Sequence, residues 1–281
     1  MTGMNRVMVT GAAGQLGSTI VARLSARCEV VPFTRSQLDI VDEQAVIDAA
    51  RSAAPDVIIN CAAYNDVDRA EDEAADAFGG NACGVLSLSR AAVAVDATFV
   101  HYSTDFVFDG NTDTPYGEDE PPKPLSTYGT SKLLGEWFAL EAPSTYVLRV
   151  ESLFGGHPAK SSVDKIVAAI VGGRPVRVFA DRTVTPSYVD DVSVATEALL
   201  ARRPPAGIYH CVNSGTTTWL GVAVEAARLL DRQAEIVAVD MSQVNLRAKR
   251  PRYCALSNRK LADIGVTMPA WQDALKRYVH R

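Results

Sequence analysis

The amino-acid sequence predicts an α/β fold, in which a doubly wound parallel sheet carries helices on both faces and a smaller C-terminal lobe follows. Short apolar runs alternate with longer helix-like stretches, which is typical of a parallel sheet covered on both sides. Several of the apolar runs are uninterrupted, as expected for strands that are buried on both faces. The chain of 281 residues is long enough for a large core.

Strands and helices are expected in alternation along the chain. The apolar runs that predict strands are Val7–Thr10, Glu29–Phe33, Val57–Asn60, Thr98–Tyr102, Tyr146–Arg149 and Val176–Phe179. Helical patterns cover Gln15–Ala26, Asp42–Ala53, Asn81–Val95, Thr130–Leu140, Ser162–Val171 and Asp190–Ala201. The proline-rich stretch Glu120–Pro124 cannot lie inside a helix, so we expect a loop before the helix at Thr130.

The composition excludes several classes of protein. The net charge of −5 disfavours a nucleic-acid binder, which usually has a basic face. No apolar run approaches the ~20 residues of a membrane span. The first residues lead directly into the strand at Val7, which leaves no room for a signal peptide. The five cysteines are scattered and odd in number, so we expect reduced thiols in a cytoplasmic protein.

A glycine-rich turn follows the first strand. Gly11, Gly14 and Gly17 open the first helix, where a backbone without side chains can approach a pyrophosphate and the helix N-terminus favours its charge. The spacing differs from Gly-x-Gly-x-x-Gly, so a plain turn with tight helix packing stays open. We expect a Rossmann-type dinucleotide-binding domain at 1–154, with a returning helix near 187–212. The remainder, 155–281, is expected to form mainly a substrate-binding lobe.

The residues after the second strand bear on the choice of cofactor. Thr34 and Arg35 stand where an acid usually binds the ribose, and a hydroxyl with a guanidinium suits a 2′-phosphate. NADPH is therefore expected over NADH, although NADH remains possible and Arg35 could be a solvated loop cation. Asp39 and Ile40 could reach the adenine, and the small residues in Asn60–Tyr64 permit close approach of backbone to a dinucleotide.

Tyr128 and Lys132 are four residues apart, so they share one face of a helix. A free phenol has a pKa near ~10, and a neighbouring cation lowers it toward the working range of an acid–base catalyst. Ser103 and Thr104 end the fourth strand, and either hydroxyl can hold a carbonyl oxygen while Tyr128 delivers a proton. The alternative is a Ser/Thr cap with Asp105 in a turn.

Several stretches between residue 11 and about residue 261 together resemble the dTDP-4-dehydrorhamnose reductase family of extended short-chain dehydrogenases/reductases. They are GAAGQLG, NCAAYNDVDRAE, STDFVFDG, YGTSKLLGE, TPSYVDD, GIYHCVNSG and RPRYCALSNRKL. The resemblance implies NADPH-dependent reduction of the C4 ketone of a nucleotide-linked 4-keto-6-deoxysugar. It implies that Tyr128 protonates the alkoxide, that Lys132 holds the nicotinamide ribose and depresses the Tyr128 pKa, and that Thr104 hydrogen-bonds the substrate oxygen.

The resemblance also assigns binding residues by matching position. The implied cofactor contacts are Gly11, Gly14, Gln15, Leu16, Asp39, Ile40, Ala62, Ala63 and Tyr64. The implied sugar contacts are Val67, Thr104, Asp105 and Phe106.

One stretch departs from the family pattern. The family usually has Leu-Arg-Thr-Ser-Trp-Val-Tyr-Gly where this chain has Leu148–Gly155, so Ser152 replaces an aromatic residue near the sugar and Glu151 lies beside it. Losing the ring removes stacking surface. Glu151 could accept sugar hydroxyls or pair with an Arg. A different sugar is therefore an open alternative.

Other functions share this fold. A dehydratase needs an acid beside Asp105, where this chain has Phe106, and no Cys lies between Cys83 and Cys211 for an epimerase-reductase. A non-catalytic NADP-binding regulatory subunit stays open, although Tyr128 and its partners are intact.

The remaining charged and polar groups receive plainer interpretations. The four histidines lack metal-ligand spacing, so no metal is expected, and His101 is interpreted as a packed residue. The acidic residues within 66–76 suggest a solvated face, and a weak divalent ion site is the alternative. A basic group could meet a diphosphate or form a solvated turn, and a homodimer is possible. The basic group consists of Arg247, Lys249, Arg250 and Arg252.

Overall fold

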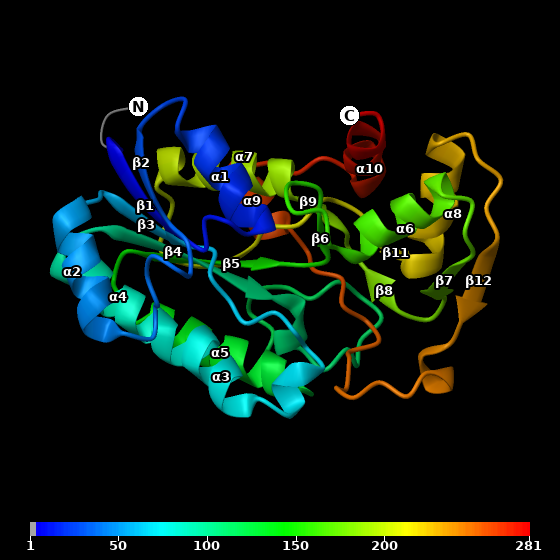
Figure 1. The fold of residues 1–281 in the computed structure, drawn as a ribbon, viewed down its shortest axis with the longest axis horizontal. Coiled ribbons are helices and arrows are strands. Elements are labelled where there is room, and N and C mark those ends of the chain that lie inside the picture. Colours follow the sequence, from blue (N-terminus) through cyan, green and yellow to red (C-terminus); the bar gives the residue numbers. More distant parts are fainter. Residues whose placement is uncertain (1–3) are drawn as a thin grey trace.

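The computed structural model describes residues 4–281, in which a six-stranded parallel sheet lies between two layers of helices (Figure 1). The predicted doubly wound α/β fold is therefore confirmed. The strands, in their spatial order, are β10 (Gly207–His210), β5 (Thr145–Val150), β4 (Thr98–Thr104), β3 (Val57–Asn60), β1 (Arg6–Thr10) and β2 (Glu29–Phe33). Part of the signal-peptide prediction falls on residues 1–3, which lie outside the described residues.

Helices cover both faces of this sheet (Figure 1). One layer contains α1 (Gln15–Leu24) and α7 (Val189–Arg202), and the other contains α2 (Glu43–Ala53), α4 (Gly84–Ala94) and α5 (Thr127–Ala139). Successive strand side chains point to opposite faces. Val7 and Val9 accordingly pack under α1 and α7, whereas Met8 packs under α2 and α4.

Shorter elements complete this part of the chain and its connections. They are the helices α3 (Ala74–Phe78) and α9 (Arg259–Asp263), the single turns η1 (Arg69–Glu71), η3 (Asp105–Val107) and η4 (Met241–Gln243), and the π-helix η2 (Gly79–Cys83). No helix within residues 4–281 is long and apolar enough to cross a membrane.

A second apolar core, which contains Phe154, Trp219 and Trp271, lies beside the sheet within the elements at the right of Figure 1. It is enclosed by α6 (Ser162–Val171), α8 (Trp219–Leu229), α10 (Trp271–Val279) and the strands β6 (Leu153–Phe154), β7 (Val176–Phe179), β8 (Thr183–Val184), β9 (Ser187–Tyr188), β11 (Thr217–Thr218) and β12 (Ile236–Val239). Between these segments the chain returns to the main sheet through α7 and β10. The division at residue 154 stays a prediction.

The sixth strand of the main sheet is β10 and not the predicted run at Val176–Phe179. That run does form a strand, β7, but it pairs with β12 in a separate two-stranded sheet. β10 was missed because it lies at the sheet edge, where Gly207 and Ile208 are only half-buried, so its sequence shows no continuous apolar run.

Two helix starts differ by three residues from the predicted ones, and both concern the site. α5 begins at Thr127, because the Ser126 hydroxyl accepts a hydrogen bond from the Gly129 amide at 3.1 Å. This start places Tyr128 in the first helical turn. α4 begins only after the π-helix, in which the Asn81 side chain binds the backbone N–H and C=O of Tyr64 at 2.8 and 3.0 Å.

Candidate active site

The glycine turn has the geometry of a backbone cradle. Gly11 has φ +68°, and a Cβ placed there would lie 2.5 Å from the Ala62 amide nitrogen. A Cβ on Gly17 would lie 2.2 Å from the Gly11 carbonyl oxygen. Gly14 caps α1 without a side-chain hydrogen bond, so the N-terminal amides of α1 are not capped by a side chain. The cradle therefore fits an anionic group held by backbone N–H groups.

Gly17→Ala is expected to lower the free energy of unfolding by about 1–3 kcal/mol and to weaken dinucleotide binding, because the added methyl group pushes the Gly11 carbonyl out of the turn. Chemical denaturation and NADPH titration measure both effects. Gly79→Ala is the matched control, since its Cβ would meet nothing closer than a Val41 methyl at 3.9 Å. Equal effects of the two substitutions would contradict a tight cradle.

The other predicted cofactor residues lie along the same strand ends but differ in exposure. Arg35 and Asp39 are exposed, and Arg35 forms no ion pair with any residue in 4–281. Thr34 bonds to Gln37 within its own turn. Ile40 and Leu16 are buried in the core. Ala62, Ala63 and Tyr64 are half-buried. The Gln15 side-chain amide donates a hydrogen bond to Asp164 of α6.

Tyr128 is brought together with residues predicted to contact the sugar. It belongs to a small apolar cluster against which Tyr64, Val67 and Phe106 pack, and its ring meets Phe106 edge-on with the ring centroids 5.5 Å apart. Only 8% of Tyr128 is exposed. Residues from the loop after the third strand, from the end of the fourth strand and from α5 therefore form a single apolar wall.

The expected lowering of the Tyr128 pKa by Lys132 is not found. Burial raises the pKa of Tyr128, the Asp105 carboxyl raises it further, and the Thr104 hydroxyl only partly opposes these effects. The Lys132 ammonium instead donates to the Tyr102 carbonyl at 2.6 Å. Burial lowers the pKa of Lys132 to about 8. Desolvation outweighs the i, i+4 pairing, because both side chains lie in the interior.

His101 is fully buried, and its ring continues a polar chain toward Lys132. The Asn60 amide oxygen accepts from Thr10 and from the Ala62 amide, so the Asn60 NH₂ group faces His101 Nδ1 at 3.1 Å. His101 Nδ1 is then an acceptor, and the proton of the neutral ring lies on Nε2, 3.4 Å from Lys132 Nζ. Two donors face one another there, which disfavours the charged form of Lys132.

Thr104 and Asp105 are both buried at the end of β4, directly beside Tyr128. The Thr104 hydroxyl donates to Asp105 Oδ1 at 2.9 Å and accepts from the Phe106 amide at 3.2 Å. Glu151 also points into the protein, and its Oε2 accepts from the Thr185 amide at 2.7 Å. Ser152 is half-buried with φ +46°, a conformation that a bulky residue rarely adopts.

A buried ion pair lies next to the site, and it was not predicted from the sequence. The Arg149 guanidinium donates to both carboxylate oxygens of Glu136, at 2.7 and 2.8 Å. Ser103, which directly precedes Thr104 on β4, donates its hydroxyl hydrogen bond to the same carboxylate. A charged residue within an apolar strand run, such as Arg149 in β5, is the one signal that could have indicated a buried partner.

Two further buried groups approach the site from the second lobe. Arg182 and Cys254 both lower the pKa of the Asp105 carboxyl group, and they are hydrogen-bonded to each other. Arg182 is far from Asp105 in the sequence and belongs to no recognisable motif. No local signal could therefore have placed it at the site.

The acidic and basic groups bind each other across the two parts of the chain. Arg250 pairs with Asp68 at 2.7 Å and Arg247 pairs with Asp72, while Arg252 lies 3.7 Å from Asp181. The acidic residues are therefore not only a solvated face, because two of them hold the segment that carries the basic group. A sequence pattern could not show this, since about 180 residues separate the partners. Diphosphate binding by the basic group stays a prediction.

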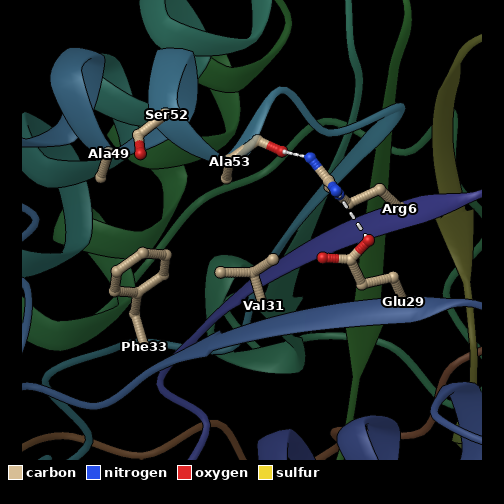
Figure 2. Close-up of a pocket in the computed structure, with 7 residues that line it drawn as sticks. All are labelled: Arg6, Glu29, Val31, Phe33, Ala49, Ser52 and Ala53. Atoms are coloured by element: carbon tan, nitrogen blue, oxygen red, sulfur yellow. Dashed lines mark hydrogen bonds and ion pairs between the residues drawn. The ribbon is translucent and has the colours of Figure 1, made fainter.

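Two hollows on the surface of residues 4–281 were not predicted from the sequence. One, of about 430 Å³, lies between the edge strand β2 and α2, where Figure 2 shows Arg6 bonded to the Ala53 carbonyl and to Glu29. The Arg6 guanidinium is therefore already paired, and this hollow is remote from Tyr128 along the sheet. The other, of about 420 Å³, is lined by Thr183 and Tyr253, the chain neighbours of Arg182 and Cys254. The second hollow therefore adjoins the buried groups behind Asp105.

Comparison with known proteins decides the family. A family model described as "RmlD substrate binding domain" matches residues 4–281. The chain belongs to this family. The dTDP-4-dehydrorhamnose reductase of Streptomyces griseus is 38% identical, with 96% of this chain and 91% of that protein covered. The spore coat polysaccharide biosynthesis protein SpsK of Bacillus subtilis (strain 168) is 32% identical, with 98% and 97% covered.

A solved structure extends the comparison to three dimensions. The dTDP-4-dehydrorhamnose reductase of Bacillus anthracis str. Ames, in complex with NADP, superposes with a TM-score of 0.94 at 31% identity, over 98% of each chain. The predicted resemblance to the reductase family is thus confirmed, and the chain is an NAD(P)H-dependent oxidoreductase of that family.

Proposed function

We propose that this protein uses NADPH to reduce the C4 ketone of a nucleotide-linked 4-keto-6-deoxysugar. The observation that carries the proposal is the grouping of Tyr128, Thr104 and Lys132, all buried, at the carboxyl ends of the strands that also carry the glycine cradle. The named relatives support the substrate class, since they are called dTDP-4-dehydrorhamnose reductases. We also expect the protein in the cytoplasm, which its five unpaired cysteines support.

The chain's own groups can perform the proton half of the reaction. When bound, NADPH supplies the hydride. Because burial raises its pKa, the Tyr128 phenol keeps its proton and can give it to the far more basic alkoxide oxygen. Thr104 lies beside Tyr128 and can hold the same oxygen, and Lys132 would face the nicotinamide ribose. The Gly11 turn and the amides at the start of α1 would hold the pyrophosphate.

The test is NADPH oxidation by the purified protein against a panel of nucleotide-linked 4-keto-6-deoxysugars that includes dTDP-4-dehydrorhamnose. The proposal expects at least one member to be reduced. Preference for a sugar other than dTDP-4-dehydrorhamnose would favour the alternative raised by Glu151 and Ser152. NADPH binding without reduction of any member would favour the non-catalytic regulatory subunit.

Arg35→Ala is expected to raise the dissociation constant of NADPH about tenfold or more and to leave that of NADH nearly unchanged. Arg35 is exposed at the end of β2, and a hydrogen bond to a charged group contributes about 1.5–3 kcal/mol. Titration with each dinucleotide measures the change. Arg51→Ala, which removes another exposed cation at the end of α2, is the control. Equal losses for both dinucleotides would mean that Arg35 does not contact the 2′-phosphate.

A further inference from the structure

Behind Asp105 lies a buried cluster formed by side chains from separate segments. One carboxylate oxygen of Asp105, one of Glu151 and the sulfur of Cys254 lie within 4.8 Å of one another. Arg182 Nη2 donates to Cys254 Sγ at 3.3 Å, and its guanidinium lies over the Phe106 ring, 5.2 Å from the centroid. All four side chains are more than nine-tenths buried.

The charges of this cluster do not balance if both acids are ionised. Among residues 4–281, Arg182 is the cation that lowers the pKa of both carboxyl groups. Cys254 is neutral, because burial raises the pKa of its thiol well above the usual value and its sulfur donates to the Pro251 carbonyl. A further titratable neighbour is the Tyr253 phenol, whose pKa is raised by burial. Two buried carboxylates beside one guanidinium favour the uptake of one proton, and the same guanidinium repels a metal ion.

The hydrogen bonds show where that proton can lie. Asp105 Oδ1 accepts from Thr104, and Glu151 Oε2 accepts from the Thr185 amide. The second oxygen of each carboxyl group, Asp105 Oδ2 and Glu151 Oε1, is buried and forms no hydrogen bond of normal geometry among the described residues. The nearest side-chain donors are the Cys254 thiol, which lowers the pKa of Asp105, and the Thr185 hydroxyl, which lowers the pKa of Glu151. Buried polar atoms are rarely left unpaired. One proton shared between these oxygens, directly after a small rotation or through one water, gives both a partner.

The same pair controls the only proton of the Thr104 hydroxyl. That proton is donated to Asp105 at 2.9 Å, so Thr104 has none left for a ketone oxygen. If the shared proton moves onto Asp105, the carboxyl becomes a poorer acceptor and Thr104 is released to donate to the substrate.

We propose that Glu151 is a positioning residue, which shares one proton with Asp105 and thereby lets the Thr104 hydroxyl turn from Asp105 to the reacting oxygen. This inference rests on the proposed reduction. It also gives a role to the carboxylate that departs from the family pattern at position 151. In this role Glu151 acts through Asp105 and Thr104, without contact to the cofactor or the substrate.

The kinetic test is a double-mutant cycle of Glu151→Gln and Thr104→Val. Gln keeps an acceptor for the Thr185 amide but has no proton to share, so Asp105 stays ionised and retains the Thr104 proton. We expect kcat to fall about tenfold or more, toward the ~10²-fold loss typical of a missing donor to the reacting oxygen, while KM changes little. In the Thr104→Val background the same change should alter kcat less than about twofold. Glu118→Gln, at a half-buried carboxyl that accepts from the His210 amide, is the matched control.

A second measurement does not require turnover. Infrared difference spectroscopy should detect one protonated carboxyl group at neutral pH in the wild-type protein and in Glu118→Gln, and should lose it in Glu151→Gln. Additive kinetic effects, or no protonated carboxyl group in the wild type, would overturn the inference. If no sugar nucleotide is reduced, the proposed function fails, while the shared proton still stands or falls on the infrared spectrum. If Glu151→Gln does not fold, the wild-type spectrum is compared with that of Asp105→Asn, which should also lose the signal of the protonated carboxyl group.

Discussion

Tyr128→Phe is expected to lower kcat by roughly 10²–10⁴-fold while NADPH still binds, because the substitution removes only the positioned proton donor. Phe keeps the ring in its apolar cluster, where the edge-on contact with Phe106 remains. Steady-state NADPH oxidation gives kcat, and titration of the protein with NADPH gives the affinity.

The matched control for that substitution is Tyr116→Phe. Tyr116 is also buried and stacks on Phe108 at 4.1 Å, but its hydroxyl binds Asp109 and not the site. We expect this variant to retain a kcat close to that of the wild type. A Tyr128→Phe protein that reduces the substrate at nearly the wild-type rate would contradict the assignment of Tyr128 as the proton donor.

The largest expected effect on stability comes from Glu136→Leu, which should lower the free energy of unfolding by about 3–5 kcal/mol. The Glu136 and Arg149 side chains are 1% and 2% exposed, so the substitution leaves a guanidinium buried without its counter-charge. It also deprives the Ser103 hydroxyl of its acceptor, directly before Thr104 on β4. Urea denaturation measures the change.

Two comparisons separate the buried charge from other causes. Glu136→Leu combined with Arg149→Met removes both charges, and it should cost much less than the single substitution, since an apolar pair of similar volume can replace a buried ion pair. Glu43→Ala breaks the exposed pair with Arg90 and should cost no more than about 1 kcal/mol. A double variant as unstable as the single one would show that packing, rather than the unpaired cation, accounts for the loss.

The strands at Glu29–Phe33 and Val57–Asn60 were predicted to the residue, because apolar runs bounded by polar or turn residues are a local signal. Helix α6 was predicted equally well, since Ser161 and Asp164 form a capping box at its start. β10 was not predicted, because an edge strand needs only partial burial and its partner, β5, lies about 60 residues earlier in the chain. Boundaries thus follow the sequence wherever the stabilising contacts are local.

By itself, the sequence determined the strands β1 to β5 of the main sheet, the glycine turn and the presence of Tyr128 and Lys132 on one helix face, because each depends on neighbours within a few residues. The tertiary structure alone decided what those groups can do. It buried Tyr128 and Lys132, so that desolvation outweighs their attraction, and it joined Asp105, Glu151 and Arg182 from segments far apart. Proton affinity depends on the dielectric surroundings and on every nearby charge, and these are properties of the folded chain that no local pattern encodes.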